Sequence, residues 1–532
     1  GAGPAGLVAA LTLLRNGVRV RIIDKEFDYR LGQRGLGLTP RSLELFRFLD
    51  VTAVEELARG PHPMRVYKPG TLTPVKTFTL TPYMETTPAF PYFNPVMLGQ
   101  QTLEAILRSH LEEMSCSVEL GTGLRSFEQN EDRVLASIVR KVDGEDYEET
   151  VECQWLIGAD GARGVTRKLL GLNFIGETRD DVVFISGDIR LSSASIDRQH
   201  WHQFSGGATK TLSLRPSDEI GPDGFQFCTR LTYDTQALFD HIRSVTTADI
   251  IYNQLVWVSE FRFKPNVRMV EKLGVGRIFI AGGPVHSPTG GQFNLSWKLA
   301  LVTKNLAPPS LLTTYTTERI PVIAEMLQLS TQLLDKTVKL TADTAQGALQ
   351  RSERMHMLGV NYRSSPIVID EYDRGTEYVD AYGPIRASCL VAGDRAPDAP
   401  SLVPTVVNRT GPVTVSESIR LFDLFRPSFH TVLLFTTDVA WAVSTVQAIE
   451  VDRDVIRWVM VIPQSAPSFT ESFPPFDLIL HDREGHAYRG YHVEMEDSKV
   501  FVVRPDGVLG AIVRGREGLG RYFDVIFNPA SH

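Results

Sequence analysis

The chain has 532 residues, of which 43% are hydrophobic and 22% charged, and its formal net charge is −8. This length predicts about three domains, and the negative charge argues against a nucleic-acid partner. The sequence holds no run of about 18 apolar residues, so we expect no membrane span. Its four cysteines are scattered without CxxC spacing. That pattern fits reduced thiols in a cytoplasmic protein and predicts no metal site.

The first 24 residues form a candidate dinucleotide-binding unit. Gly1, Gly3 and Gly6 fit the pattern G-x-G-x-x-G, and Asp24 ends an apolar strand predicted over residues 18–23. In this pattern the glycines permit a tight turn, close approach of a pyrophosphate and close helix packing, and the acid bonds a ribose hydroxyl. A glycine-rich turn without a nucleotide is the alternative, and the spacing of helix, strand and acid argues against it. The strand expected before the motif is not in this sequence.

The next candidates lie on a loop and at the start of a helix. Arg34 and Arg41 flank a glycine-rich loop, where they either face phosphates or are ordinary solvated arginines. Gln100 opens a clear amphipathic helix predicted over residues 100–114. Its side-chain amide either bonds the sugar chain of a ligand or is a plain helix-start residue. The residues alone leave each pair of alternatives open.

Two apolar strands run into polar or glycine-rich turns. Residues 155–158 lead into Asp160, Gly161 and Arg163, and residues 277–280 lead into a second glycine turn. In open α/β sheets ligands bind at the carboxyl ends of strands. We therefore expect both turns at a ligand site. A helix is predicted over residues 294–302, after the second turn.

The rest of the chain divides by pattern. Residues 60–95 hold eight prolines, which predicts an excursion from the first sheet. Residues 174–265 alternate strands with loops, as in a mainly antiparallel layer that covers a substrate. Beyond residue 386, strands alternate with helices as in a separate α/β domain. There the Asp506-Gly507 pair predicts a tight hairpin turn.

Several motifs occur together along nearly the whole chain. They are GAGPAG with Asp24, GQRGLG with PRSLE, LGQQTLE, GADGARG, FKPNVRMVEK, HSPTGGQ, NLSWKLALV and APPSLLTTY. With them the chain resembles the flavin-dependent aromatic hydroxylases of the phenol 2-monooxygenase type. The segments AGDRAPDA and VVRPDG resemble the thioredoxin-like domain of that family. This part of the chain has only Cys389, so dithiol chemistry is unavailable to it.

The resemblance implies an α/β fold of several units. A Rossmann-like FAD-binding domain is expected over residues 1–173 and 266–340, with the mainly antiparallel substrate sheet of residues 174–265 interleaved. A helical linker segment is expected over residues 341–385. The C-terminal thioredoxin-like α/β domain is expected over residues 386–532, where it would serve packing or the formation of a homodimer.

The resemblance also implies FAD, reduced by NADPH and reacting with O₂ to hydroxylate a phenolic or other aromatic compound. The residues that it assigns to the cofactor are Gly1, Gly3, Gly6, Asp24, Arg34, Gln100, Asp160, Gly161, Arg163, Gly283, Pro288, Gly290 and Gly291. Arg268 is the candidate catalytic residue near the substrate, with a structural surface arginine as the alternative. Pro288 and the backbone of Gly290 and Gly291 are expected beside the flavin ring.

Two departures from the family pattern concern the flavin, and a third concerns the substrate. Gly283 stands where the family has an aspartate, and Phe293 follows Gln292 directly where the family has Gly-Leu-Asn-Thr-Gly and a helix start. A charged hydrogen bond contributes about 1.5–3 kcal/mol, so both losses together predict FAD binding weakened by about a thousandfold or more. A phenol-deprotonating aspartate, which some members have in the loop of residues 32–41, is also absent.

Two other functions compete with the hydroxylase reading. A non-catalytic or defective relative would keep the fold with an impaired flavin site, which fits the shortened second motif. An NAD-linked dehydrogenase is disfavoured, because its fingerprint would not explain GADGARG or HSPTGGQ.

Overall fold

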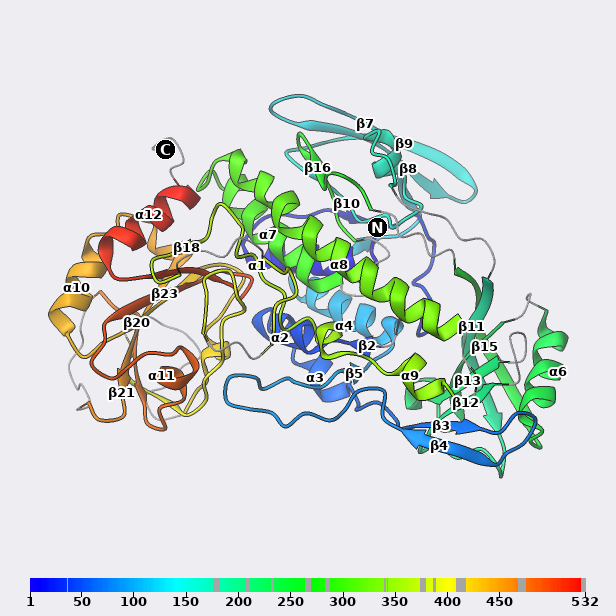
Figure 1. Ribbon diagram of the computed structural model, residues 1–532. Coiled ribbons are helices and arrows are strands. Elements are labelled where there is room, and N and C mark those ends of the chain that lie inside the picture. The colour runs from blue at the N-terminus through cyan, green and yellow to red at the C-terminus, as the bar shows by residue number, and fades with distance from the viewer. Residues whose placement is uncertain are drawn as a thin grey trace.

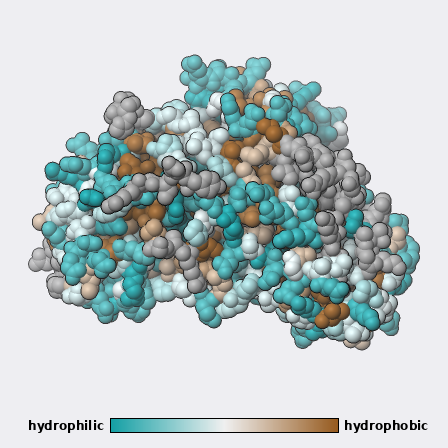
Figure 2. All heavy atoms as spheres, viewed as in Figure 1, coloured by the Kyte–Doolittle hydropathy of each residue, from teal (hydrophilic) through white to brown (hydrophobic). Residues whose placement is uncertain are grey.

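The computed structural model describes residues 1–35, 37–175, 182–205, 211–230, 234–263, 269–282, 288–338, 341, 343–373, 379–385, 389–407, 418–466 and 475–527. Figure 1 shows a helical layer in the middle, a large sheet at one end and a C-terminal α/β unit at the other. On the face in Figure 2, hydrophobic patches are broken up by hydrophilic residues. Among the described helices none combines the length and apolar character needed to cross a membrane.

The glycine motif opens the central layer. Helices α1 (Pro4–Arg15), α4 (Gln100–Glu113) and α7 (Pro288–Thr303) pack together here, with α1 between the other two. Parallel pairs are formed by β1 (Ile22–Ile23) with β6 (Val118–Glu119) and by β10 (Leu156–Gly158) with β17 (Ile278–Ile280). Strand β16 (Gly274–Val275) is antiparallel to β17. Strand β1 covers only the last two residues of the strand predicted over residues 18–23, where it pairs with β6.

A seven-stranded sheet forms one end of the molecule. Its order is β15 (Ile251–Phe263), β11 (Val182–Ser192), β14 (Gly224–Thr229), β13 (Thr211–Pro216), β12 (Trp201–Ser205), β3 (Met64–Tyr67) and β4 (Pro74–Phe78). All neighbours are antiparallel except β12 and β3. The mainly antiparallel sheet is therefore confirmed, and the proline-rich excursion supplies its last two strands. Helix α6 (Thr235–Thr246) packs on it through Leu238 and Ile242, which are fully buried.

Smaller elements surround the central layer. Strands β7 (Thr122–Gln129), β8 (Val134–Val142) and β9 (Glu145–Cys153) form an antiparallel sheet, and β2 (Gly37–Leu38) pairs with β5 (Val96–Met97). The turn between β8 and β9 has φ of 51° at Asp143 and 86° at Gly144, as the Asp-Gly pair predicts. Helices α2 (Pro40–Phe48) and α3 (Ala53–Leu57) follow β2.

The C-terminal unit is built on a second seven-stranded sheet. Its order is β18 (Ile369–Asp370), β24 (Leu509–Val513), β23 (Lys499–Val503), β20 (His430–Phe435), β21 (Ile456–Pro463), β22 (Leu478–Asp482) and β19 (Leu402–Val407). Helices α10 (Val439–Gln447), α11 (His486–Gly490) and α12 (Arg516–Phe527) accompany it. Gly507 has φ of 69° in the turn before β24, as predicted. Because β18 precedes residue 386, this sheet takes an edge strand from the expected linker segment.

The long helix α8 (Thr313–Val338) crosses the middle of the molecule (Figure 1), and Pro321 lies inside it. The short helix α9 (Ala345–Leu349) follows. The N-terminal and C-terminal parts share one hydrophobic core. At its centre the ring of Phe48 lies 5.0 Å from that of Phe422 and 5.6 Å from that of Phe425.

Candidate functional site

The glycine motif forms a tight start of helix α1 against the end of β10. Gly3 is the N-cap of α1, and Pro4 takes the first helical position, where its fixed φ suits a helix start. A Cβ on Gly6 would overlap the carbonyl oxygen of Gly1, and a Cβ on Gly1 would overlap that of Ala159. These two glycines therefore serve close packing, as the fingerprint requires. At Gly3 an added Cβ would meet only Arg30 and Glu104, at 3.2 and 3.9 Å.

Asp24 follows β1 and lies beside the start of α1. Its carboxylate accepts hydrogen bonds from the N–H groups of Ala2, at 2.7 Å, and Glu26, at 3.1 Å. The guanidinium of Arg30 is 3.4 Å away. Burial raises the pKa of this carboxyl, but the two N–H donors and the Arg30 charge outweigh burial, and the pKa lies below its ordinary value. Asp24 is therefore ionised at neutral pH and is held next to the glycine motif.

Arg30 and Glu104 were not predicted, yet they are the side chains nearest to Gly3. Glu104 is buried on α4, and the side-chain amide of Gln100 donates a 2.8 Å hydrogen bond to it. Burial raises the pKa of Glu104. The i, i+4 spacing of Gln100, Glu104 and Arg108 on one helix face was a signal that could have pointed to this cluster.

Two predicted residues take other local roles. Arg34 has φ of 38°, in the left-handed region, and its guanidinium lies 5.1 Å from the ring centre of Trp257 on β15. The backbone N–H of Gln100 donates to the carbonyl oxygen of Gln33 at 3.0 Å. The loop of residues 32–35 thus joins the start of α4 to the large sheet.

The turn after β10 also has a structural role. Asp160 accepts hydrogen bonds from the N–H of Thr166, at 2.9 Å, and from its hydroxyl, at 3.0 Å. It thereby supports the start of α5 (Val165–Leu169). Gly161 has φ of 73°, which favours glycine, and Arg163 is exposed.

The second glycine motif differs from its prediction. Helix α7 begins at Pro288 rather than at residue 294, so Gly290 and Gly291 lie inside a helix and not in a turn. Gly291 is buried, and an added Cβ there would lie 3.6 Å from Nε of Arg319. Proline at the first helical position favours this earlier start, and burial of the helix offsets the low helix propensity of glycine. Gly283 and Arg268 lie outside the described residues.

Behind α7 lies a buried cluster of charges. Glu318 of α8 accepts from Lys298 of α7 at 2.7 Å and from both terminal nitrogens of Arg504, at 2.8 and 3.0 Å. Asp506 pairs with Arg504 at 2.6 Å. Burial lowers the pKa of Lys298 to about 8. Although burial opposes it, the charges of Arg504 and Lys298 hold the pKa of Glu318 well below its ordinary range.

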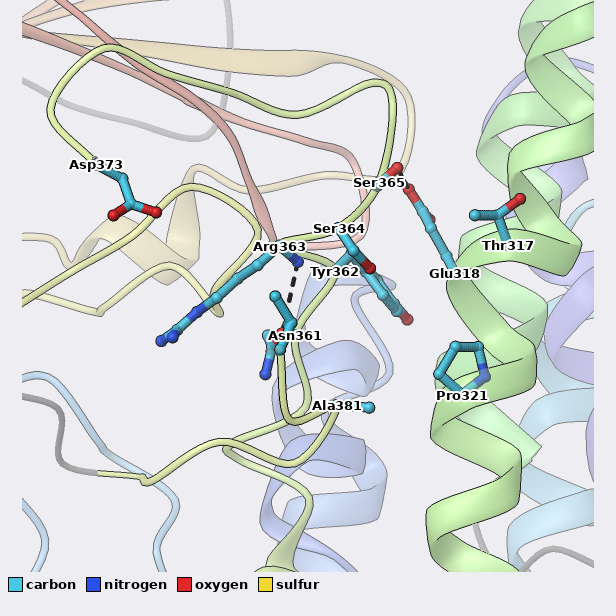
Figure 3. Close-up of a pocket in the computed structure, with 11 residues that line it drawn as sticks. Thr317, Glu318, Pro321, Asn361, Tyr362, Arg363, Ser364, Ser365, Asp373 and Ala381 are labelled. Atoms are coloured by element: carbon cyan, nitrogen blue, oxygen red, sulfur yellow. Dashed lines mark hydrogen bonds between the residues drawn. The ribbon is translucent and has the colours of Figure 1, made fainter. Parts of the chain in front are cut away.

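A cavity of about 480 Å³ opens beside this cluster. In Figure 3, Glu318 and Pro321 from α8 face Tyr362 and Ser365 from the loop before β18. None of its eleven lining residues belongs to the glycine motif or its neighbours. The cavity is therefore separate from the cluster of Gly3, Asp24 and Arg30.

Comparisons with known proteins agree with the geometry. The model of the FAD binding domain family matches residues 1–330. A flavin-dependent monooxygenase of Mycobacteroides abscessus is 32% identical over 456 residues, covering 82% of this chain and 87% of that protein. The pentachlorophenol 4-monooxygenase of Sphingobium chlorophenolicum is 28% identical over 502 residues, covering 87% of this chain and 84% of that protein.

A solved structure is similar over almost the entire chain. The flavin-dependent monooxygenase PieE, in complex with FAD and substrate, has a TM-score of 0.76 and 21% identity, covering 99% of this chain and 97% of that chain. At this identity the likeness concerns the fold.

Proposed function

Because the chain belongs to the family of FAD-dependent monooxygenases, we propose that it hydroxylates a phenolic or other small aromatic compound, with NADPH as the reductant and O₂ as the co-substrate. The observation that carries the proposal is the preformed cluster of Gly3, Asp24 and Arg30 at the start of α1. Relatives named as monooxygenases span most of the chain. A non-catalytic relative is therefore not favoured.

The described residues fit the ADP half of FAD. An added Cβ at Gly3 would meet only the side chains of Arg30 and Glu104 and no backbone, and the N-terminus of a helix favours an anion such as a pyrophosphate. Arg30 adds a positive charge beside this position, and the ionised Asp24 suits a ribose hydroxyl. Bound FAD supplies the electron transfer and oxygen activation that hydroxylation needs.

The remaining cofactor assignments are part of the same proposal. Residues of the predicted set that lie farther along the chain would contact the pyrophosphate, the ribityl chain or the flavin ring, and they are Arg34, Gln100, Asp160, Gly161, Arg163, Gly283, Pro288, Gly290 and Gly291. The division into FAD-binding, substrate-sheet, linker and C-terminal units, with the bounds predicted from the sequence, is proposed as well. Arg268 is proposed near the substrate.

Calorimetry with ADP tests the nucleotide site independently of turnover. Replacing Asp24 with alanine removes an acceptor for a ribose hydroxyl and unpairs Arg30 and the N–H of Ala2. A hydrogen bond to a charged group contributes about 1.5–3 kcal/mol, so the Asp24→Ala variant should bind ADP about tenfold to a hundredfold more weakly. The matched control is Asp132→Ala, an exposed acid in the turn before β8. Equal ADP affinity in the wild type and Asp24→Ala would refute the nucleotide assignment.

A further inference from the structure

A row of side chains crosses four neighbouring strands of the large sheet. The strand register places Asp188 of β11 opposite Trp257 of β15 on one side and opposite Gln226 of β14 on the other. Gln226 in turn lies opposite Arg215 of β13. Residues that are directly opposite each other in a sheet project from the same face. The four side chains therefore share one face.

This face packs against the loop of residues 32–35, which precedes β2. The N–H of Gln33 donates a 2.9 Å hydrogen bond to Oδ2 of Asp188, and Nη2 of Arg215 donates a 2.8 Å bond to Oε1 of Gln33. A Cβ on Gly32 would overlap the ring of Trp257. The row thus faces the loop of residues 32–35, which the N–H of Gln100 joins to the start of α4 through its hydrogen bond to Gln33.

Two polar atoms of this row are buried and unpaired within the described part of the chain. They are Oδ1 of Asp188, an acceptor, and Nε of Arg215, a donor. Asp188 is 2% exposed and Arg215 4% exposed. A buried polar atom without a partner costs about 1–3 kcal/mol. The strands that hold the two residues are about 10 Å apart. A ligand with one hydroxyl group near each residue would give both unpaired atoms a hydrogen-bond partner.

We propose that Asp188 is the group that accepts the proton of the substrate's phenolic hydroxyl. This inference rests on the proposed function. The O–H bond of the phenol breaks, the proton goes to Oδ1 of Asp188, and the electron pair stays on the phenolic oxygen. The step involves no oxidation, and it makes the aromatic ring more electron-rich for hydroxylation. The loop of residues 32–41 has no aspartate, and Asp188 contacts this loop from the sheet through its hydrogen bond with Gln33.

The charges around Asp188 suit this role. Burial raises the pKa of Asp188 to about 6. The hydrogen bond from the Gln33 N–H and the charge of Arg215 lower this pKa, and the charge of Glu219 raises it. Arg34 faces the row from the loop, with its guanidinium over Trp257. A general base works best when its pKa lies near the pH of the reaction.

The test compares Asp188→Asn with the wild type on two phenols of different acidity. Asparagine keeps an oxygen for the Gln33 N–H but cannot accept a proton. 4-Methylphenol needs a base, whereas 4-nitrophenol ionises by itself near neutral pH. The matched control is Asp223→Asn, an acid in the turn just before β14 that accepts hydrogen bonds from Arg190 and Asn253. Flavin content is measured for each protein.

General-base catalysis contributes about a hundredfold or more. With FAD saturating, Asp188→Asn should therefore hydroxylate 4-methylphenol at least about a hundredfold more slowly, and it should retain most of its activity on 4-nitrophenol. Asp223→Asn should behave as the wild type. Equal losses on both phenols, or no loss on either, would overturn the assignment.

A binding titration decides the inference without turnover. Above neutral pH, both 4-nitrophenol in solution and Asp188 in the free wild type are ionised. Binding the phenolate beside Asp188 then requires Asp188 to take up a proton, so the affinity of the wild type for 4-nitrophenol should fall by about tenfold per pH unit. Asp188→Asn should show little pH dependence. Identical pH profiles, including no binding to either protein, would refute the role of Asp188. A wild type with this profile that binds FAD yet hydroxylates no phenol would instead refute the proposed function.

Discussion

Replacing Glu318 with glutamine should destabilise the protein more than the loss of any surface ion pair. The carboxylate is fully buried and accepts five hydrogen bonds. Their donors are Lys298, Asn294, Ser365 and, twice, Arg504. A glutamine side chain would turn an N–H group towards these donors. It would also leave the buried cations Lys298 and Arg504 with Asp506 as the remaining carboxylate of the described cluster. Breaking a buried pair in this way costs about 3–5 kcal/mol.

Urea unfolding followed by tryptophan fluorescence measures this change, with Glu152→Gln as the matched control. Glu152 pairs with Arg133 at 2.8 Å on the surface, where such a pair contributes about 0–1 kcal/mol. The double variant Glu318→Gln with Lys298→Met removes one charge of each sign and should recover part of the loss. A Glu318→Gln variant as stable as the Glu152→Gln control would refute the reasoning.

Three further predictions follow from the same contacts. Arg30→Ala should weaken ADP binding, and calorimetry should show that the difference from the wild type shrinks at high salt, because a partly exposed charge is screened. The pKa of Asp188 is raised to about 6 in the folded protein, so the folded state favours the protonated carboxyl. The contribution of Asp188 to the free energy of unfolding is therefore fully present below about pH 4 and is lost as the pH rises through about 6. At pH 7.5, Asp188→Asn should thus be more stable than the wild type by up to about 3 kcal/mol, and the difference in urea midpoint should vanish towards pH 4. A fragment of residues 386–532 should unfold cooperatively on heating, but at a lower temperature than the whole chain, because it loses the packing of Phe48 on Phe422. An insoluble or molten fragment would contradict that boundary.

Features set by local chemistry could be predicted from the sequence. The glycine motif, the helix at Gln100 and the two Asp-Gly turns depend on neighbours within a few residues, and the structure has each of them. The antiparallel sheet was also predictable, because its strands alternate with loops.

Features set by long-range packing could not be predicted. The row of Asp188, Gln226 and Arg215 depends on the register of strands that are far apart in the sequence. Arg30 gains its position beside Gly3 from the fold of a loop without periodicity. The start of α7 at Pro288 depends on burial, which overrides the low helix propensity of the two glycines.

The most direct test of the central claim is the fate of labelled O₂ in a reaction with NADPH and a panel of simple and polycyclic phenols. The protein is supplied with excess FAD, because the altered second flavin motif predicts weak retention of the cofactor. The account predicts that the protein binds FAD and that each hydroxylated product carries one labelled oxygen atom. FAD binding without labelled product from any phenol, or no FAD binding at all, would contradict it.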